Sequence, residues 1–448
     1  MIIEELAQYA VAQVKSGLSP EVSHAAKRAL VDWFSALLPG TQVQPATSLM
    51  QAHAHELGVG RASLPGLKTT AFPATAAWIN GSVSHAVEFD DIYRDAIYHP
   101  GCPTVAASLA VAEHMQASGR RLLEAITVGY EISTRIGVAV QPSHYKYFHT
   151  TGTVGCFGGA AAAAVLVSSQ PSVTAHALAT SATFASGLQQ AFRSEAMTKA
   201  LHAGHAAWVG VTSALGADKG LTGVLDILEG SAGFGAALAN GPDWAKATDG
   251  LGSRFNIQSV TVKNHGCCGH TFASIDGLLA LRQQHGFDVQ AIERMEIRTY
   301  ATAVEVAGIR APQSPFECKF SIPYVVAHAA KYGSVRLAAF DTERIFEEDL
   351  RALMPRIQFE ADPELTSKFP NMRAAHVQVH LKSGQVLEHF QPYRIGDPEA
   401  PLTDEQISEK FLELASPVIS DRAAKQLLER LWSIDEEADV RALNLQAL

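Results

Sequence analysis

The chain has 448 residues, which is too long for one typical hydrophobic core and predicts two domains. Hydrophobic residues make up 47% and charged residues only 18%, below the roughly 25% of an average soluble protein, so we expect a partner subunit to cover part of the surface. The net charge of −10, without a run of Lys or Arg, argues against a nucleic-acid partner or an anionic membrane. Small anionic ligands stay possible, because a few cations in one cleft can bind a carboxylate.

The N-terminal residues 1–17 are acidic and amphipathic, unlike a secretory signal, which is basic and then apolar. No charge-free apolar run reaches the roughly 20 residues of a membrane span. The five cysteines are odd in number and two are adjacent, which is a poor disulfide framework and fits a reducing cytosol. We therefore expect a soluble, cytoplasmic protein.

Helical periodicity dominates residues 6–235. Apolar residues recur at spacings of three and four, and Ser19 before Pro20 is placed to cap a helix. Alanine-rich runs such as TVAASLAVAEHM and GGAAAAAVLV have little bulk on any side, so these helices can approach closely and be buried all round. Residues 1–260 are predicted to form a large all-helical domain, and the fold class is mainly α.

The pattern changes near residue 254. Residues 259–266 and 292–300 alternate like strands, a helix between them is expected to end at Gly286, and residues 373–390 predict a hairpin that turns at Ser383-Gly384. These elements predict a smaller α+β lid domain over residues 261–395.

The last segment, residues 396–448, returns to helical periodicity. Thr403 and Gln406 form the pattern of a capping box at the start of a helix. We expect this segment to pack back on the helical domain.

Four stretches concentrate residues that carry chemistry, and the first is HAVEFDDIYRDAIYHPG, residues 85–101. It is explained either as a polar loop, in which Asp90 or Asp91 caps a helix and Arg94 pairs with a carboxylate, or as part of a site. His99 precedes a Pro-Gly pair that holds its backbone extended and turned, which suits a side chain at a pocket rim. The helix that follows could attract an anion to its N-terminus.

The second stretch, HYKYFHTTGTVGCFGGAAAA, places His149 before several glycines. A phosphate loop needs a preceding strand and a terminal lysine, and the stretch has neither. Close helix packing accounts for the glycines, and a helix N-terminus that presents its N–H groups beside His149 accounts for the other residues of the stretch.

The third stretch, FRSEAMTKALHAGHAAWVG, places Lys199 and His202 on one face of a helix, and Arg193 lies in the segment that leads into it. The stretch is either an ordinary surface helix or an anion site. His202 and His205 lack a carboxylate at a useful ligand spacing, which argues against a metal.

The fourth stretch, VKNHGCCGHTFASID, contains Cys267, Cys268, His265 and His270. Adjacent cysteines rarely bind one tetrahedral zinc ion, and no second ligand pair completes such a site. Lys263 before a glycine-rich turn into a helix makes a better site for a carboxylate. The common hydrolase, metalloprotease, dinucleotide and NTPase signatures are absent from the sequence, which leaves a cofactor-free site of His, Lys, Asp/Glu and Tyr.

Together these stretches, with GLTGVLDILEGSAGF and KFSIPYVVAHA, resemble the MmgE/PrpD family in order and over nearly the whole length. That family includes 2-methylcitrate dehydratase, cis-aconitate decarboxylase and iminodisuccinate epimerase. The resemblance implies a large helical domain plus a smaller α+β lid, a homodimer, an active site between the domains, and neither metal nor organic cofactor. It also implies a small di- or tricarboxylate substrate that loses a proton next to a carboxylate.

Residue by residue, the resemblance places the acid and base at His99 and His149. It places Lys199 and Lys263 as cationic substrate binders and Asp91, a further candidate catalytic residue, on the family's second aspartate. Further candidates for substrate binding are Arg193, His202, Cys268, His270 and, near a family tyrosine, Tyr324.

Two positions depart from the family pattern H-A-x-D-F-D-D-T. Glu88 replaces the first aspartate and is one methylene longer, and Ile92 replaces the threonine, which removes a hydrogen-bonding group. We count Glu88 among the candidate catalytic residues. The spacing to His99 is also one residue longer than in the decarboxylase pattern.

The predicted activity is that of a cofactor-independent lyase of the dehydratase type, which abstracts an α-proton from a small di- or tricarboxylate. Removing that proton adds negative charge to an anionic group, so the transition state needs cations such as Lys199 and Lys263. A histidine tuned by a nearby carboxylate is a competent base near pH 7. The alternatives are an epimerase of the iminodisuccinate kind, a non-catalytic polycarboxylate-binding protein, and a zinc enzyme.

Overall fold

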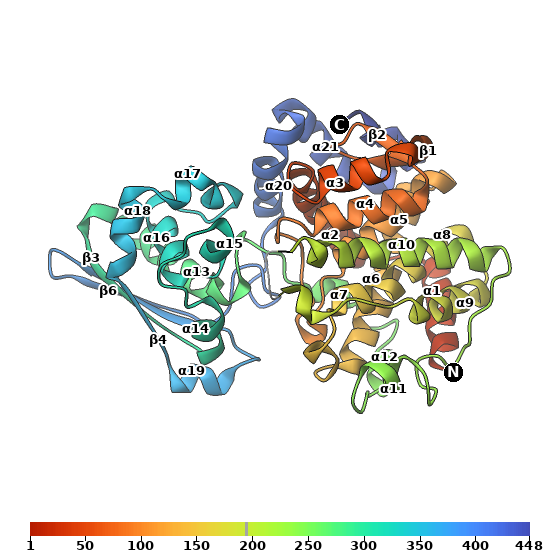
Figure 1. Cartoon of the computed structure of the whole chain (residues 1–448), viewed down its shortest axis with the longest axis horizontal. Helices are drawn as coiled ribbons and strands as arrows, with labels where there is room; N and C mark the ends of the chain where they lie inside the picture. Colours follow the sequence, from red (N-terminus) through yellow and green to blue (C-terminus); the bar gives the residue numbers. More distant parts are fainter. Residues whose placement is uncertain (193–195) are drawn as a thin grey trace. The chain divides into compact units, whose positions relative to one another are not determined.

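The computed structural model describes residues 1–192 and 196–448 and has two compact units (Figure 1). Unit 1 comprises Met1–Thr261 and Thr403–Leu448, and unit 2 comprises Val262–Leu402. The sequence places the corresponding boundaries after residues 260 and 395. The chain is mainly helical with a smaller α+β unit, which confirms the predicted fold class.

Unit 1 consists of helices and one small sheet. Its helices are α1 (Ile2–Ser16), α2 (Pro20–Gly40), α3 (Ala46–Ala52), α4 (Pro73–Ser84), α5 (Gly101–Met115), α6 (Gly119–Val140), α7 (Thr150–Thr153), α8 (Gly155–Val167), α9 (Pro171–Thr183), α10 (Thr198–Asp218), α11 (Phe234–Leu238), α12 (Ala245–Thr248), α20 (Asp404–Ile419) and α21 (Asp421–Trp432). The expected cap is confirmed, because the Ser19 side chain accepts a hydrogen bond from the backbone N–H of Val22 at the start of α2.

The centre of unit 1 is α8, which packs against α5, α6, α9 and α10. Small residues make this close packing possible. A Cβ atom added to Gly210 on α10 would lie 2.4 Å from the carbonyl carbon of Gly159 on α8, so no larger residue fits there. The run Thr150–Val167 is long and apolar enough to cross a membrane by composition, but 94% of it is buried inside the protein, as expected of a core helix.

Two short strands in unit 1 correct the prediction of nearly continuous helix up to residue 235. β1 (Leu57–Leu64) and β2 (Thr69–Ala71) pair antiparallel. Two glycines explain the break in the helical pattern. Gly58 has a left-handed φ of 77°, and a Cβ on Gly60 would lie 1.9 Å from the carbonyl oxygen of Ala71, so the partner strand needs the missing side chain.

The C-terminal helices α20 and α21 belong to unit 1, and α20 packs along α2. The predicted capping box is confirmed. The Thr403 hydroxyl accepts from the N–H of Gln406, and the Gln406 side chain accepts from the N–H of Thr403.

Unit 2 contains a four-stranded sheet of order β4-β3-β5-β6. Its elements are α13 (Phe272–His285), β3 (Ile292–Thr299), α14 (Ala301–Ala307), α15 (Pro315–Lys319), α16 (Ile322–Tyr332), α17 (Thr342–Ile345), α18 (Glu348–Leu353), β4 (Ile357–Ala361), α19 (Pro363–Lys368), β5 (Ala375–Leu381) and β6 (Val386–Gln391). β3 pairs parallel with β4 and antiparallel with β5, and α13 packs on β5 and β6. The expected hairpin is confirmed as β5 and β6, and α13 ends at Gly286 in the left-handed conformation.

The predicted strand over residues 259–266 is wrong. Asn256–Ser259 forms a turn of 3₁₀ helix, and Thr261 makes only an isolated bridge to Ile92. The alternating letters are misleading because Val262, Lys263 and His265 are all buried, so burial does not follow the alternation.

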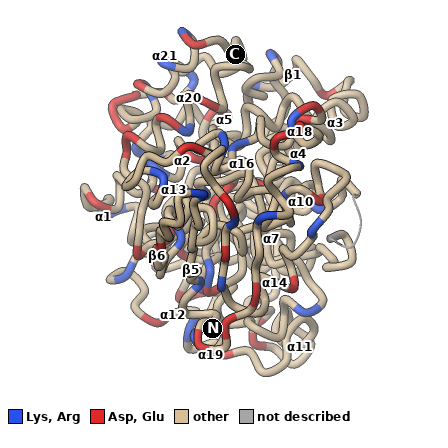
Figure 2. The backbone as a smooth tube through the Cα atoms, turned by 90° about the vertical axis from the view of Figure 1, so that its left-hand side faces the viewer, with Lys and Arg blue, Asp and Glu red and all other residues tan. Residues whose placement is uncertain are grey.

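The charged residues are mixed along the chain. Figure 2 shows short basic and acidic stretches interspersed over the part of the chain that the structure describes. Any cationic site must therefore be assembled by the fold from residues distant in sequence.

Candidate active site

The loop between α4 and α5, residues 85–100, contains the first of the four chemistry-bearing stretches. His85 is the C-terminal cap of α4, and α5 begins at Gly101. Between them Glu88 has a left-handed φ of 60°, a conformation that is uncommon outside glycine. Backbone conformations of this kind cluster at functional sites.

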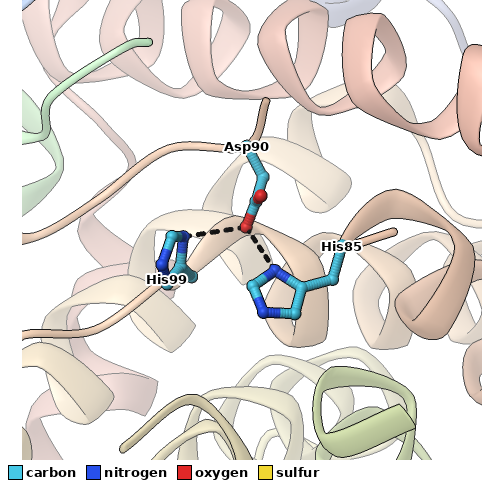
Figure 3. A group of neighbouring side chains, drawn as sticks. All are labelled: His85, Asp90 and His99. Atoms are coloured by element: carbon cyan, nitrogen blue, oxygen red, sulfur yellow. Dashed lines mark hydrogen bonds and ion pairs between the residues drawn. The ribbon is translucent and has the colours of Figure 1, made fainter. Parts of the chain in front are cut away.

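Two histidines of this loop converge on one carboxylate, that of Asp90 (Figure 3). The Nδ1 atoms of His85 and His99 lie 2.8 Å and 2.9 Å from the same oxygen, Oδ2 of Asp90. The Cys102 thiol donates to that oxygen at 3.1 Å. His85 and Asp90 are buried, and 15% of the His99 side chain is exposed.

Asp90 is held ionised by these neighbours. Burial raises its pKa, but the charges and hydrogen bonds of His85 and His99 outweigh burial, so the pKa lies well below the usual value. An ionised carboxylate only accepts hydrogen bonds, so both Nδ1 atoms act as donors to it. This arrangement turns Nε2 of His99 to the side away from Asp90 and supports positive charge on the ring.

A second pair of histidines lies beside this group. His149 is the N-terminal cap of α7, and its Nδ1 lies 3.0 Å from Nδ1 of His202 on α10. The His149 ring stacks on that of His85 with centroids 5.5 Å apart, and its centroid is 6.5 Å from that of His99. The two predicted acid–base residues, His99 and His149, are therefore brought together from the α4–α5 loop and the start of α7.

The environment of His149 keeps it neutral. Burial lowers its pKa well below the usual value, and the nearby His85 and Lys199 lower it further. Burial also lowers the pKa of His202 to about 4. At neutral pH both rings are therefore proton acceptors rather than cations.

Lys199 and Glu88 form an ion pair at the edge of the cluster. Lys199 lies in the first turn of α10, and both side chains are partly exposed. Burial lowers the pKa of Lys199, but the charge and hydrogen bond of Glu88 raise it more, so the ammonium is stable. Glu88, one of the two departures from the family pattern, therefore contacts a predicted substrate-binding lysine.

Asp91 points away from the histidine cluster. It accepts hydrogen bonds from the N–H of Gly101 at 2.9 Å and from the Tyr130 hydroxyl at 2.8 Å. Burial, and then the charge of Asp32, raise its pKa to about 7. These contacts join the loop to α5 and α6.

Four predicted site residues belong to unit 2. Lys263 is buried, and the N–H of Cys268 donates to the carbonyl of Lys319. Nδ1 of His270 lies 2.8 Å from the Tyr300 hydroxyl, and burial lowers the pKa of His270 to about 3.

Tyr324 is fully buried in the core of unit 2, and its hydroxyl donates to the carbonyl of Ala339. The predicted binder Arg193 lies outside the described residues.

An open hollow of about 510 Å³ borders His202. Its lining residues come from the segment before α10 and from its first turns: Ser186, Gly187, Leu188, Gln190, Ala191, Ala196, Thr198 and His202. It is large enough for a small polycarboxylate and reaches the cluster from the side of α10.

Two residues of the cluster are not predicted from the sequence. His85 was not singled out, and Asp90 was considered only as a helix cap. A carboxylate beside His99 is the partner that a tuned histidine needs, and two acidic residues nearby in the loop could supply it. The sequence does not show which of Asp90 and Asp91 points inward, because that depends on the left-handed turn at Glu88.

Among the described residues, His85, Asp90 and His99 form a group whose ligand atoms all lie within 4.8 Å of one another. Tetrahedral zinc, with bonds of about 2.0–2.1 Å to nitrogen and oxygen, separates its ligands by roughly 3.3 Å. The observed 2.8 Å and 2.9 Å are hydrogen-bond lengths. The group therefore fits protons better than a metal ion.

Comparison with known proteins identifies two matching domain families. Residues 4–247 match the MmgE/PrpD N-terminal domain and residues 265–434 match the MmgE/PrpD C-terminal domain. A cis-aconitate decarboxylase-like protein of Aspergillus oryzae is 26% identical, over 99% of this chain and 96% of its own length. Human cis-aconitate decarboxylase is 27% identical over 83% and 78%, and that of Aspergillus terreus is 23% identical over 97% of each.

Proposed function

Because the chain belongs to the MmgE/PrpD family, we propose that it is a cofactor-independent lyase that moves a proton next to a carboxylate of a small di- or tricarboxylate. Its relatives named cis-aconitate decarboxylase support a lyase acting on a tricarboxylate. The single observation that carries the proposal is the convergence of His85 and His99 on Asp90, next to the neutral His149.

We assign His149 as the base and His99 as the acid. His149 is neutral because it is buried among other cationic or titratable groups, so it can accept the α-proton. His99 is supported as a cation by the ionised Asp90, so it can donate. In a dehydration, His99 protonates the leaving hydroxyl, which departs as water, while the electron pair of the broken C–H bond forms the double bond.

The same two groups accommodate a decarboxylation. The bond to the departing carboxylate breaks, carbon dioxide leaves, and the electron pair that stays on carbon takes a proton from an imidazolium. In both reactions negative charge grows beside a carboxylate, and the Lys199 ammonium is positioned to stabilise it. A substrate carboxylate competes with Glu88 for that ammonium.

An epimerase is the second candidate. His99 and His149 come from different elements, with centroids 6.5 Å apart, so one can remove a proton while the other returns one. The product separates the two candidates, since a lyase creates a double bond and an epimerase inverts a stereocentre.

The test is proton NMR in heavy water with citrate, methylcitrate, cis-aconitate, malate, tartrate and iminodisuccinate. If the protein is a lyase, a hydroxy acid should gain deuterium at the α-carbon and give a new vinyl signal. Cis-aconitate should give a changed vinyl signal and release carbon dioxide. Deuterium incorporation with inversion alone would support the epimerase. Saturable binding without exchange in the whole panel would contradict both and favour a binding protein.

The homodimer and the cytoplasmic location expected from the sequence belong to this proposal. Light scattering coupled to gel filtration should give about twice the 47.8 kDa of one chain. A mass of one chain at micromolar concentration would contradict the dimer.

A further inference from the structure

A buried ion pair lies directly behind the active-site loop. Lys410 on α20 is fully buried, and its Nζ lies 2.5 Å from Oδ1 of Asp32 on α2. Asp32 is 1% exposed. A pair so deeply buried loses much of its attraction to desolvation, so stability alone is a weak reason for it.

The ammonium of Lys410 also contacts the loop itself. It donates to the carbonyl of Phe89 at 3.1 Å and lies 4.5 Å from the centre of the Phe89 ring. Phe89 stands between Glu88, which pairs with Lys199, and Asp90, which binds both histidines. The bonded carbonyl belongs to the peptide group that precedes Asp90, so its orientation sets the direction in which the Asp90 side chain leaves the backbone.

The loop requires such a support. Glu88 has a left-handed φ of 60°, which a non-glycine residue keeps only when its surroundings impose it. After this turn, Lys410 binds the peptide that precedes Asp90, and Gly101 and Tyr130 bind Asp91, which follows it. The inward direction of Asp90 follows from these two attachments.

We propose that Lys410, paired with Asp32, is a positioning residue that holds the Phe89–Asp90 peptide so that Asp90 orients His85 and His99 for proton transfer. The inference rests on the proposed function. Lys410 touches no reacting atom and acts through the loop, which connects the C-terminal helix α20 to the chemistry. A small rotation of the peptide moves Asp90, and proton transfer requires heavy-atom distances near hydrogen-bond length.

The test compares two ion pairs that both join α2 to the C-terminal segment. Lys410→Met keeps the length of the side chain and removes its charge. Lys27→Met is the matched control, since Lys27 on α2 binds Asp435 at 2.6 Å without a contact to the loop. The double variant Asp32→Asn with Lys410→Met removes both charges of the pair and is expected to fold even where the single variant does not.

Turnover is measured with the substrate found in the heavy-water panel, and kcat and KM are separated. We expect Lys410→Met and the double variant to lose at least tenfold in kcat with KM within threefold, and Lys27→Met to stay within twofold of wild type in both. The double variant should keep the loss in kcat while its melting temperature approaches that of wild type. A folded double variant with kcat within twofold of wild type would overturn the proposal.

A second readout is independent of turnover. With ¹⁵N-labelled histidine, the imidazole N–H protons of His85 and His99 that donate to Asp90 should give downfield signals in wild type and Lys27→Met. They should be lost or shifted in Lys410→Met and in the double variant, and unchanged signals would overturn the positioning role. If wild type shows no turnover with any substrate, the proposed function fails, whereas these signals still decide whether Lys410 positions the loop.

Discussion

Two segments of the chain each contain two histidines, cysteine and aspartate, but they differ in how the histidines are paired. In residues 85–102 of unit 1, two histidines and a thiol share one oxygen of Asp90. In residues 263–276 of unit 2, the two histidines have different partners. There His265 binds Asp276 at 2.9 Å, and His270 binds Tyr300 at 2.8 Å.

This difference separates two uses of a histidine. A carboxylate that binds a single histidine satisfies a buried polar group and fixes the packing around it. Asp276 is such a carboxylate, and it also accepts a hydrogen bond from the N–H of Ile395 at 2.8 Å. A shared carboxylate beside further histidines sets several protonation states at once. A His–Asp pair by itself is therefore a weak sign of a catalytic site, and convergence is a stronger one.

The largest expected effect comes from Asp90→Asn. The amide cannot support positive charge on His99 or accept from both Nδ1 atoms, so kcat should fall by about 10³-fold, within the range for general acid–base groups. Steady-state turnover in the heavy-water assay measures it. The matched control is Asp276→Asn in the other His–Asp pair, for which we expect a lower melting temperature and a change in kcat of less than about tenfold. Equal losses of kcat in Asp90→Asn and Asp276→Asn would contradict the distinction between a carboxylate shared by two histidines and one that binds a single histidine.

His149→Gln should have the next largest effect. Glutamine keeps a polar side chain of similar reach but removes the base, and we expect kcat to fall by about 10²-fold. His265→Gln is the control in unit 2. The acid limb of the pH profile of kcat/KM should be absent in His149→Gln and present in His265→Gln. An unchanged acid limb in His149→Gln would assign the base elsewhere.

A smaller effect is expected at the ion pair on the edge of the cluster. Lys199→Met removes a charge-assisted contact to the substrate and should raise KM by about 10-fold to 100-fold. Glu88→Gln should change KM in the opposite direction, because it removes the carboxylate that competes for the ammonium. An equal rise of KM in both variants would mean that Glu88 also binds the substrate.

The smallest effects are opposite dependences of stability on pH in the two segments. Asp91 has its pKa raised from 3.8 to about 7, so the folded state holds the proton more tightly and stability falls as pH rises from about 4 to 7. His270 has its pKa lowered from 6.5 to about 3, so its contribution is complete above pH 6.5 and is lost as pH falls towards 3.

Urea unfolding between pH 4 and 8 measures both. Asp91→Asn should reduce the fall in the free energy of unfolding towards high pH. His270→Gln should reduce the fall towards low pH. Each slope should change by up to about 1.4 kcal/mol per pH unit. Parallel curves for wild type and Asp91→Asn would show that Asp91 does not titrate in this range.

Several elements could be predicted because their cause is local. The cap at Ser19, the capping box of Thr403 and Gln406, and the left-handed Gly286 each depend on residues within one helical turn. The hairpin of β5 and β6 depends on alternation and a short turn. The strand expected at residues 259–266 does not form because a strand needs a continuous ladder with a partner, and at Thr261 the pairing is an isolated bridge to Ile92.

The sequence by itself determined the helical character of unit 1, the change to α+β at unit 2, and the six stretches that carry the family resemblance. Only the tertiary structure decided that Asp90 and not Asp91 points to the histidines, and that Lys410 reaches Phe89 across 321 positions of the chain. The physical reason is that residue types and periodicity are local properties. The direction of a side chain in an irregular loop is set by backbone torsions such as φ at Glu88, and these are imposed by contacts from distant helices.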